Sequence, residues 1–133
     1  GQRAKVTHSS YDSENGLLAV EFVDQYGQTF RRETIFSPGS ITIRDRMSNR
    51  RVTGTFISLI HLAPEVVVVA EETPATYSFT INNTFFSIKT GVTVRSAPHV
   101  WYPDFGRPVK SEKLILSNPQ AEAIDYVITW KPA

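Results

Sequence analysis

Apolar residues alternate with polar ones along almost the whole of this chain, in short runs separated by turn residues. Strict alternation places successive side chains on opposite faces of an extended backbone, so it is typical of half-buried β-strands rather than of helices. The run from Ile41 to Met47 is one example. Turn residues separate about ten such runs at intervals of about eight to twelve residues. We therefore predict an all-β fold, an antiparallel β-sandwich of about ten strands with little or no helix.

Two tight turns are predicted from their residue types. Pro38 precedes Gly39, and this pair suits a type II turn because glycine accepts the positive φ needed at its position. Asn82 and Asn83 separate two alternating runs, and asparagine also tolerates positive φ. We therefore expect a two-residue hairpin loop at the asparagine pair.

Four other segments carry specific expectations. The segment from Leu17 to Gln25 has a helix as its alternative, but it lacks helical apolar spacing and is rich in strand-forming residues. Val52 to Leu62 is expected to form one long strand. The run from Val66 to Val69 is apolar on both faces, which favours a central strand covered on both sides. Residues 97–108 are rich in proline and aromatic residues, and we expect a loop there.

Composition limits the classes of function. A chain of 133 residues without internal repeats or linkers suits a single domain over residues 1–133. The absence of cysteine excludes disulfides, thiolate zinc sites and a cysteine nucleophile. The net charge of +1 does not favour binding to nucleic acid, which calls for a basic domain. No apolar run approaches the roughly eighteen residues of a membrane-spanning helix.

The sequence contains no recognisable catalytic constellation. It has no Gly-x-Ser-x-Gly elbow, so a hydrolase triad is not supported. Glu71 and Glu72 are adjacent, and neighbouring side chains on a strand point to opposite faces, so we interpret them as a solvated strand end. The segment 12–16 carries oxygen ligands but departs from the EF-hand spacing, and we interpret it as a turn, with a calcium site as the alternative.

The three histidines lack the close spacing of a local metal site. His61 lies in an apolar strand, and we interpret it as a packed histidine with a satisfied nitrogen. His99 lies in the expected loop, a kind of segment that often carries function. His8 lies near the start of the chain.

Arginines are concentrated in two neighbouring runs that are expected to form a hairpin. Arg31, Arg44 and Arg46 would then lie close together, and guanidinium groups bind carboxylate or sulfate in bidentate fashion. This pattern points to an acidic polysaccharide. The alternative is a solvated outer face on which Glu33 and other acids balance the arginines.

Asp45 shares the alternation phase of the apolar residues in its run, so its side chain is expected to face inward. A buried carboxylate requires a partner. Arg32, across the expected hairpin, is the candidate for a structural ion pair with Asp45.

Trp101 and Tyr102 follow His99 closely, and Phe105 completes an aromatic cluster. Exposed aromatic rings stack on sugar rings, so these residues are candidates for carbohydrate contact together with His99. The alternative is an aromatic plug at one end of the sandwich.

Several stretches of this chain resemble, in order, the C-terminal β region of heparinase II/III-like proteins, a family of bacterial polysaccharide lyases. The stretches are FRRE (30–33) with ITIRDR (41–46), HLAPEV (61–66) and YPDFGRPV (102–109), and HSSYD (8–12) resembles a segment that precedes them. The chain departs from the family pattern at Phe30, where a histidine is usual, and at residues 9–10, where Asp-Gly is usual.

The resemblance implies a parent enzyme that cleaves uronate-containing acidic polysaccharide by β-elimination. The family's main acid and base residues lie in an α-helical toroid and a β segment that this sequence lacks, so the resemblance implies a non-catalytic C-terminal fragment whose partners are those missing segments. It also implies a periplasmic or secreted location, and a divalent metal in the parent, for which His8 is the one candidate ligand carried over. No other cofactor is evident. The alternative is a self-standing carbohydrate-binding or adhesion sandwich, and a complete small enzyme is the third reading.

Overall fold

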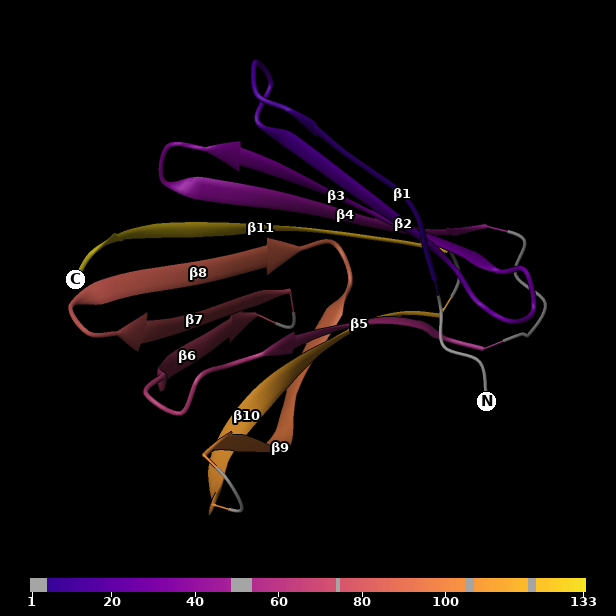
Figure 1. The fold of residues 1–133 in the computed structure, drawn as a ribbon. Coiled ribbons are helices and arrows are strands. Elements are labelled where there is room, and N and C mark those ends of the chain that lie inside the picture. The colour runs from indigo at the N-terminus through magenta and orange to yellow at the C-terminus, as the bar shows by residue number, and fades with distance from the viewer. Residues whose placement is uncertain (1–4, 49–53, 74, 105–106, 120–121) are drawn as a thin grey trace.

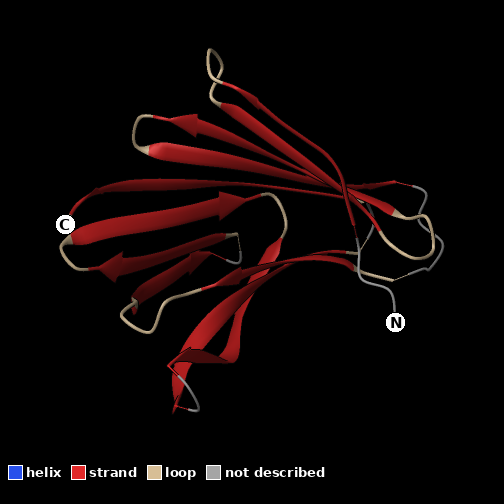
Figure 2. Cartoon of the chain, in the orientation of Figure 1, coloured by secondary structure: helices blue, strands red, loops and turns tan. Residues whose placement is uncertain are grey.

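The computed structural model describes residues 5–48, 54–73, 75–104, 107–119 and 122–133, and at 5, 68–73 and 101–104 it describes the backbone alone. The described residues form eleven β-strands and no helix, and Figure 2 shows strands connected by short loops. They therefore contain no helix that could cross a membrane. The strands are β1 (Lys5–Asp12), β2 (Leu17–Val23), β3 (Thr29–Ser37), β4 (Ser40–Ser48), β5 (Phe56–His61), β6 (Val67–Thr73), β7 (Thr76–Ile81), β8 (Thr84–Thr90), β9 (Thr93–Asp104), β10 (Arg107–Asn118) and β11 (Ala123–Pro132).

The strands form two antiparallel sheets (Figure 1). The larger sheet has eight strands in the order β1-β2-β3-β4-β11-β8-β7-β6, and the smaller has three in the order β5-β10-β9. Their facing sides share one buried core, to which the larger sheet contributes Ile88 and Tyr126 and the smaller sheet Leu114 and Leu116. The predicted β-sandwich of about ten strands is thereby confirmed.

Alternation along β5 explains how the smaller sheet buries one face. Phe56 and Ser58 are buried, whereas Ile57 and Leu59 are 48% and 41% exposed. Side chains two residues apart share a face of a strand, so a period of two in the sequence becomes a core-facing and an outward-facing set. The two faces of β5 follow the predicted pattern.

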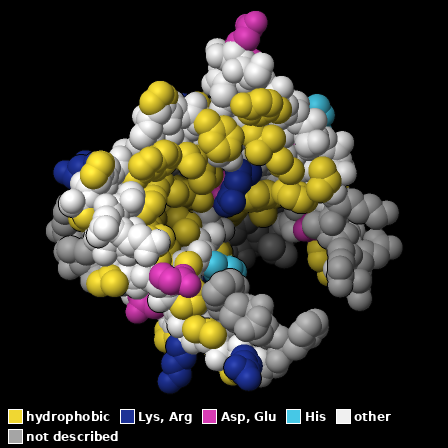
Figure 3. Space-filling model, turned by 60° about the vertical axis from the view of Figure 1, so that its left-hand side comes forward, with side chains coloured by type: hydrophobic (Ala, Val, Ile, Leu, Met, Phe, Trp, Pro, Cys, Tyr) yellow, Lys and Arg dark blue, Asp and Glu magenta, His cyan; other side chains and the backbone are white. Residues whose placement is uncertain are grey.

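The larger sheet is wider than the smaller sheet that covers it. Tyr11 and Phe36 lie on its core-facing side according to the strand register, yet they are 63% and 45% exposed. Figure 3 shows hydrophobic side chains gathered around a hollow on one face of the molecule. The β1–β3 end of the core-facing side is therefore left partly open.

The two predicted turns are confirmed, and so is the prediction of a strand rather than a helix at Leu17. Gly39 has φ +72°, as the third position of a type II turn requires, and it joins β3 to β4. Asn82 has φ +44° in the two-residue loop between β7 and β8. The segment that begins at Leu17 forms β2, and the helical alternative is wrong.

Two expectations about strands need correction. The strand expected from Val52 begins at Phe56 instead, and residues 52 and 53 lie outside the described residues. The valine run was expected to form a central strand, but β6 lies at the edge of the larger sheet and Val67 is 62% exposed. An apolar run indicates that a segment forms a strand. Whether that strand is central or at an edge depends on which other strands pair with it.

The expectation of a loop over residues 97–108 is also wrong. Most of this segment belongs to β9 and β10, which pair as a long hairpin, while residues 105 and 106 lie outside the described residues. Pro98 is accommodated because β9 is an edge strand of the smaller sheet. Proline lacks the N–H that a central strand needs for its second neighbour, but an edge position tolerates it.

Candidate functional site

The arginines that we predicted to bind polysaccharide lie on the outer face of the larger sheet. Strand register places Arg31 opposite both Glu21 on β2 and Arg46 on β4. Arg31 Nη1 lies 3.4 Å from a carboxylate oxygen of Glu21, and Arg46 Nη1 lies 2.5 Å from Asp125 Oδ1. The carboxylates thus offset two guanidinium charges that directly oppose each other.

Arg44 belongs to the same outer face. It is exposed, and the register places it opposite Glu33 on β3 and Asp125 on β11. Arginine and carboxylate side chains therefore lie together across four neighbouring strands, which agrees with the alternative interpretation of a balanced, solvated face. Polysaccharide binding by Arg31, Arg44 and Arg46 stays a prediction.

A buried polar cluster connects the larger sheet to the smaller one. Arg32 donates from Nε to Asp45 Oδ1 at 2.7 Å and from Nη2 to Asp45 Oδ2 at 2.9 Å. Ser58 on β5 donates its hydroxyl to Asp45 Oδ2 at 2.6 Å. Asp45 is completely buried, so these three hydrogen bonds satisfy a carboxylate that has no access to water. The ion pair expected between Arg32 and Asp45 is present.

Tyr126 lies beside this cluster in the shared core. Burial, and secondarily the negative charge of Asp45, raise the pKa of Tyr126 from about 10 to about 12, although the Arg32 charge acts in the opposite direction. The folded chain therefore keeps the phenol proton at a pH where the unfolded chain has lost it. Folding stability is consequently expected to fall as the pH rises between these two values.

We expect Tyr126 to ionise about two pH units later than an ordinary tyrosine while the protein stays folded. Tyrosinate absorbance followed against pH will detect this late step. The Tyr126→Phe substitution should remove it, and the control Tyr26→Phe, at an exposed tyrosine, should leave it in place. A late step of undiminished amplitude in Tyr126→Phe would contradict the assignment.

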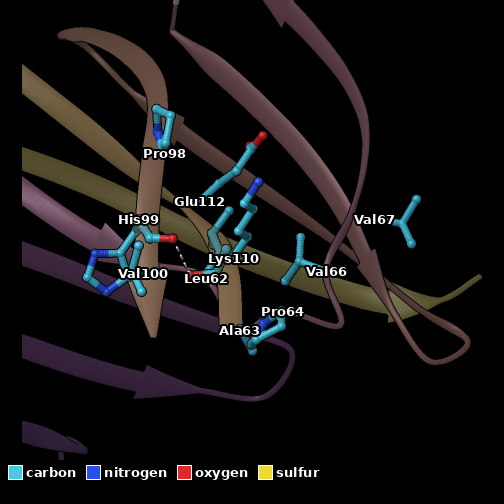
Figure 4. A pocket seen from close by; sticks show the side chains of 11 residues that line it. Leu62, Ala63, Pro64, Val66, Val67, Pro98, His99, Val100, Lys110 and Glu112 are labelled. Carbon is cyan, nitrogen blue, oxygen red and sulfur yellow. Dashed lines mark hydrogen bonds between the residues drawn. The ribbon is translucent and has the colours of Figure 1, made fainter. Parts of the chain in front are cut away.

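A cleft of about 770 Å³ opens between the segment that joins β5 to β6 and the β9–β10 hairpin. Figure 4 shows Lys110 and Glu112 on β10 facing the side of the cleft that carries Pro64 and Val66. The Tyr77 hydroxyl donates to Glu112 Oε2 at 3.5 Å. The lining residues are Leu62, Ala63, Pro64, Val66, Val67, Pro98, His99, Val100, Lys110, Ser111 and Glu112. The cleft thus combines apolar walls with one cationic and one anionic side chain.

The His99 ring points away from Lys110 and Glu112 in Figure 4. It stacks on His61, with ring centroids 4.2 Å apart and ring planes 14° apart. His61 is exposed, so its interpretation as a packed histidine is wrong. The sequence carried a signal for this, because His61 shares the alternation phase of Ile57 and Leu59, the outward-facing residues of β5.

The structure does not bring all the predicted carbohydrate-binding residues together. The three arginines lie on the larger sheet, whereas His99, Trp101 and Tyr102 lie on β9 of the smaller sheet. Only the backbone of Trp101 and Tyr102 is described, and Trp101 pairs with Val109 on β10. The candidates therefore define two separate surfaces.

His8 lies on β1 opposite Glu21 and is exposed. The Glu21 carboxylate is engaged with Arg31, which makes it a poor metal ligand. Among the described residues, no group of three His, Cys, Asp or Glu side chains is placed to hold a metal ion. The residues around His8 do not by themselves fit a metal site, and its role as a ligand stays a prediction.

Solved structures with the same fold include larger polysaccharide lyases. The heparan sulfate lyase HepC from Pedobacter heparinus superimposes with a TM-score of 0.77 at 11% sequence identity, covering 98% of this chain and 22% of that one. The heparinase III BT4657 gene product superimposes with a TM-score of 0.70 at 11% identity, again covering 98% and 22% of the two chains. This chain spans about a fifth of the length of those proteins, and at this identity the likeness concerns the fold.

Sequence comparison with protein families gives a more specific result. The family model described as "Heparinase II/III-like, C-terminal" matches residues 1–130. A comparison with curated proteins found no match. The family match covers nearly the whole sequence, and the chain therefore belongs to the heparinase II/III-like C-terminal family.

Proposed function

We propose that this chain is the non-catalytic C-terminal β-sandwich of a polysaccharide lyase that cleaves uronate-containing acidic polysaccharide by β-elimination. The family match over residues 1–130 carries this proposal. The likeness in fold to HepC, a heparan sulfate lyase, supports the substrate class. The family is also the support for a periplasmic or secreted location of the parent protein.

β-Elimination requires a base to remove the proton at C5 of the uronate and an acid to protonate the leaving glycosidic oxygen. Positive charge near the uronate carboxylate stabilises the anion that develops in the transition state. In this proposal the acid and base belong to another part of the parent protein. The sandwich contributes by contacting the polysaccharide and by packing against the catalytic part.

Of the two candidate surfaces, we favour the β9 surface of the smaller sheet for contact with polysaccharide. Arg31 and Arg46 on the larger sheet are already paired with carboxylates, which a polyanion would have to displace. His99 is not paired with a carboxylate among the described residues, and the charge of Lys113 on β10 acts on the same ring. The backbone of β9 also carries Trp101 and Tyr102, two residue types that stack on sugars.

The test compares the 133-residue chain with the longest natural open reading frame that contains it. Both are incubated with heparan sulfate and, as a control, with a neutral glucan, while the ultraviolet absorbance of the unsaturated uronate product is followed. We expect product only from the longer protein and only with the acidic substrate. Product from the 133-residue chain alone would refute a non-catalytic role.

A second outcome would favour the alternative function. A reading frame that encodes no helical catalytic region, together with glycan binding by the chain, would identify a self-standing carbohydrate-binding module. In that case the lyase proposal would be rejected.

A further inference from the structure

Three basic side chains from three different strands meet on the outer face of the smaller sheet. His61 on β5 pairs with Lys113 on β10, and His99 on β9 pairs with Ser111 on β10. Lys113 and Ser111 are two residues apart on one strand, so they share a face. The stacked imidazole rings, with centroids 4.2 Å apart, confirm that His61 and His99 reach each other across β10.

The charged side chains that the structure describes on this face of β5, β9 and β10 are all basic. Arg95 pairs with Ile115 on β10 and therefore shares the face with His61, His99 and Lys113. Glu112 belongs to the opposite face, where its carboxylate accepts a hydrogen bond from Tyr77 of the larger sheet. No carboxylate of the described side chains of β5, β9 and β10 faces outward here. The smaller sheet thus differs from the larger one, where the outward-facing Arg31 and Arg46 are paired with acids.

The stacked geometry indicates an anion rather than a metal ion as the ligand. The nitrogen lone pairs of an imidazole lie in the ring plane, and two planes only 14° apart do not direct their lone pairs at one point between them. Protonated imidazoles, in contrast, present N–H donors at the ring edges. A single oxyanion at the open edge of the stack can accept hydrogen bonds from both rings and from the Lys113 ammonium.

Protonation of this cluster is costly when no anion is bound. Loss of hydration, and then the charges of His61 and Lys113, lower the pKa of His99 below its ordinary value. A bound oxyanion would offset these repulsive charges. Anion binding and histidine protonation should therefore favour each other, because a bound anion reduces the repulsion between the protonated groups, and protonation strengthens the attraction for the anion.

We infer that His61, His99 and Lys113 form a binding site for the oxyanion of a sulfate group, which is occupied when the histidines are protonated. The site shares His99 with the β9 surface favoured above for polysaccharide, but the inference itself rests on the geometry and charge of the smaller sheet. Its ligand is either the free ion or the same group attached to a sugar.

The 133-residue chain has three histidines, so a two-dimensional NMR spectrum of the imidazole groups reports on each of them separately. Sodium sulfate is added at constant ionic strength at about pH 5.5 and at about pH 8, on either side of the ordinary histidine pKa. We expect the His61 and His99 resonances to shift saturably as sulfate is added at the lower pH. The affinity for sulfate should be at least about tenfold weaker at the higher pH. His8, on the larger sheet, serves as the internal control and should not respond.

Variants assign the response to the proposed groups. Lys113→Gln should weaken sulfate binding at the lower pH, Lys113→Arg should retain it, and His8→Gln should leave it unchanged. Equal shifts of all three histidines, equal affinity at both pH values, or unchanged binding by Lys113→Gln would each overturn the proposal. The result with unmodified protein decides the matter even where a variant does not fold.

A further comparison distinguishes the two sources of the ligand. A sulfated disaccharide and an unsulfated uronate disaccharide are titrated under the same conditions as sulfate. Tighter binding of the sulfated disaccharide than of sulfate itself would assign the site to a sulfated sugar, whereas equal affinity would assign it to the free ion. Binding of the unsulfated disaccharide as tightly as the sulfated one would overturn the requirement for a sulfate group.

Discussion

Replacement of Arg32 by methionine is expected to lower the free energy of unfolding by about 3 kcal/mol, because it leaves the buried Asp45 carboxylate without its counter-ion. Asp45 is fully buried, and the Ser58 hydroxyl would be its one remaining partner among those described. We place the effect at the lower end of the range for broken buried pairs because the Arg32 side chain is 36% exposed. Urea denaturation followed by circular dichroism or fluorescence measures the change.

Two controls separate the buried charge from the loss of a side chain. In the double variant Arg32→Met/Asp45→Asn the unpaired charge is gone, and we expect a deficit of only about 1 kcal/mol. Arg46→Met breaks a comparable pair with Asp125, but these side chains are 42% and 55% exposed, so a loss below about 1 kcal/mol is expected. If the double variant is as unstable as Arg32→Met, the explanation by an uncompensated charge is incorrect.

Leu116→Ala should lower the free energy of unfolding by about 2–5 kcal/mol, through lost burial and the cavity that remains. Leu116 lies on β10, is completely buried and belongs to the core shared by the two sheets. Leu59 provides a matched control, since it lies on the adjacent strand β5 but faces outward with 41% exposure. The same substitution there should change stability by about 0.5 kcal/mol or less. Similar losses from both substitutions would mean that the two faces of the smaller sheet are not distinguished by burial.

Local pattern was sufficient to predict most of the strands, the two faces of β5 and the Arg32–Asp45 pair. Each of these depends on residues within one strand or one short hairpin, where alternation and turn type determine register. Edge positions were not predictable in the same way. The valine run of β6 has the composition of a central strand, and the proline-containing β9 has the composition of a loop. Their actual places in the sheets depend on pairing with strands that are remote in the sequence.

The candidate site was only partly predictable for the same reason. His99 was selected from its surroundings in the sequence, but the His61–His99 stack requires both β5 and β9 to pair with β10. Asp125 neutralises Arg46 because β11 is placed next to β4 in the larger sheet. Neither contact can be predicted from the alternation of residues within a single strand.

The position of β11 has a consequence for how the chain acquires its structure. This strand follows all the others along the chain, yet it lies between β4 and β8 in the middle of the larger sheet, as Figure 1 shows. The meander of β1–β4 and the hairpins of β6–β8 have no direct strand pairing with each other until Ala123–Pro132 is in place. During synthesis on the ribosome the two halves therefore emerge as separate units with open edges. The late arrival of β11 makes completion of the larger sheet a slow, long-range step in which those edges are vulnerable to pairing with other chains.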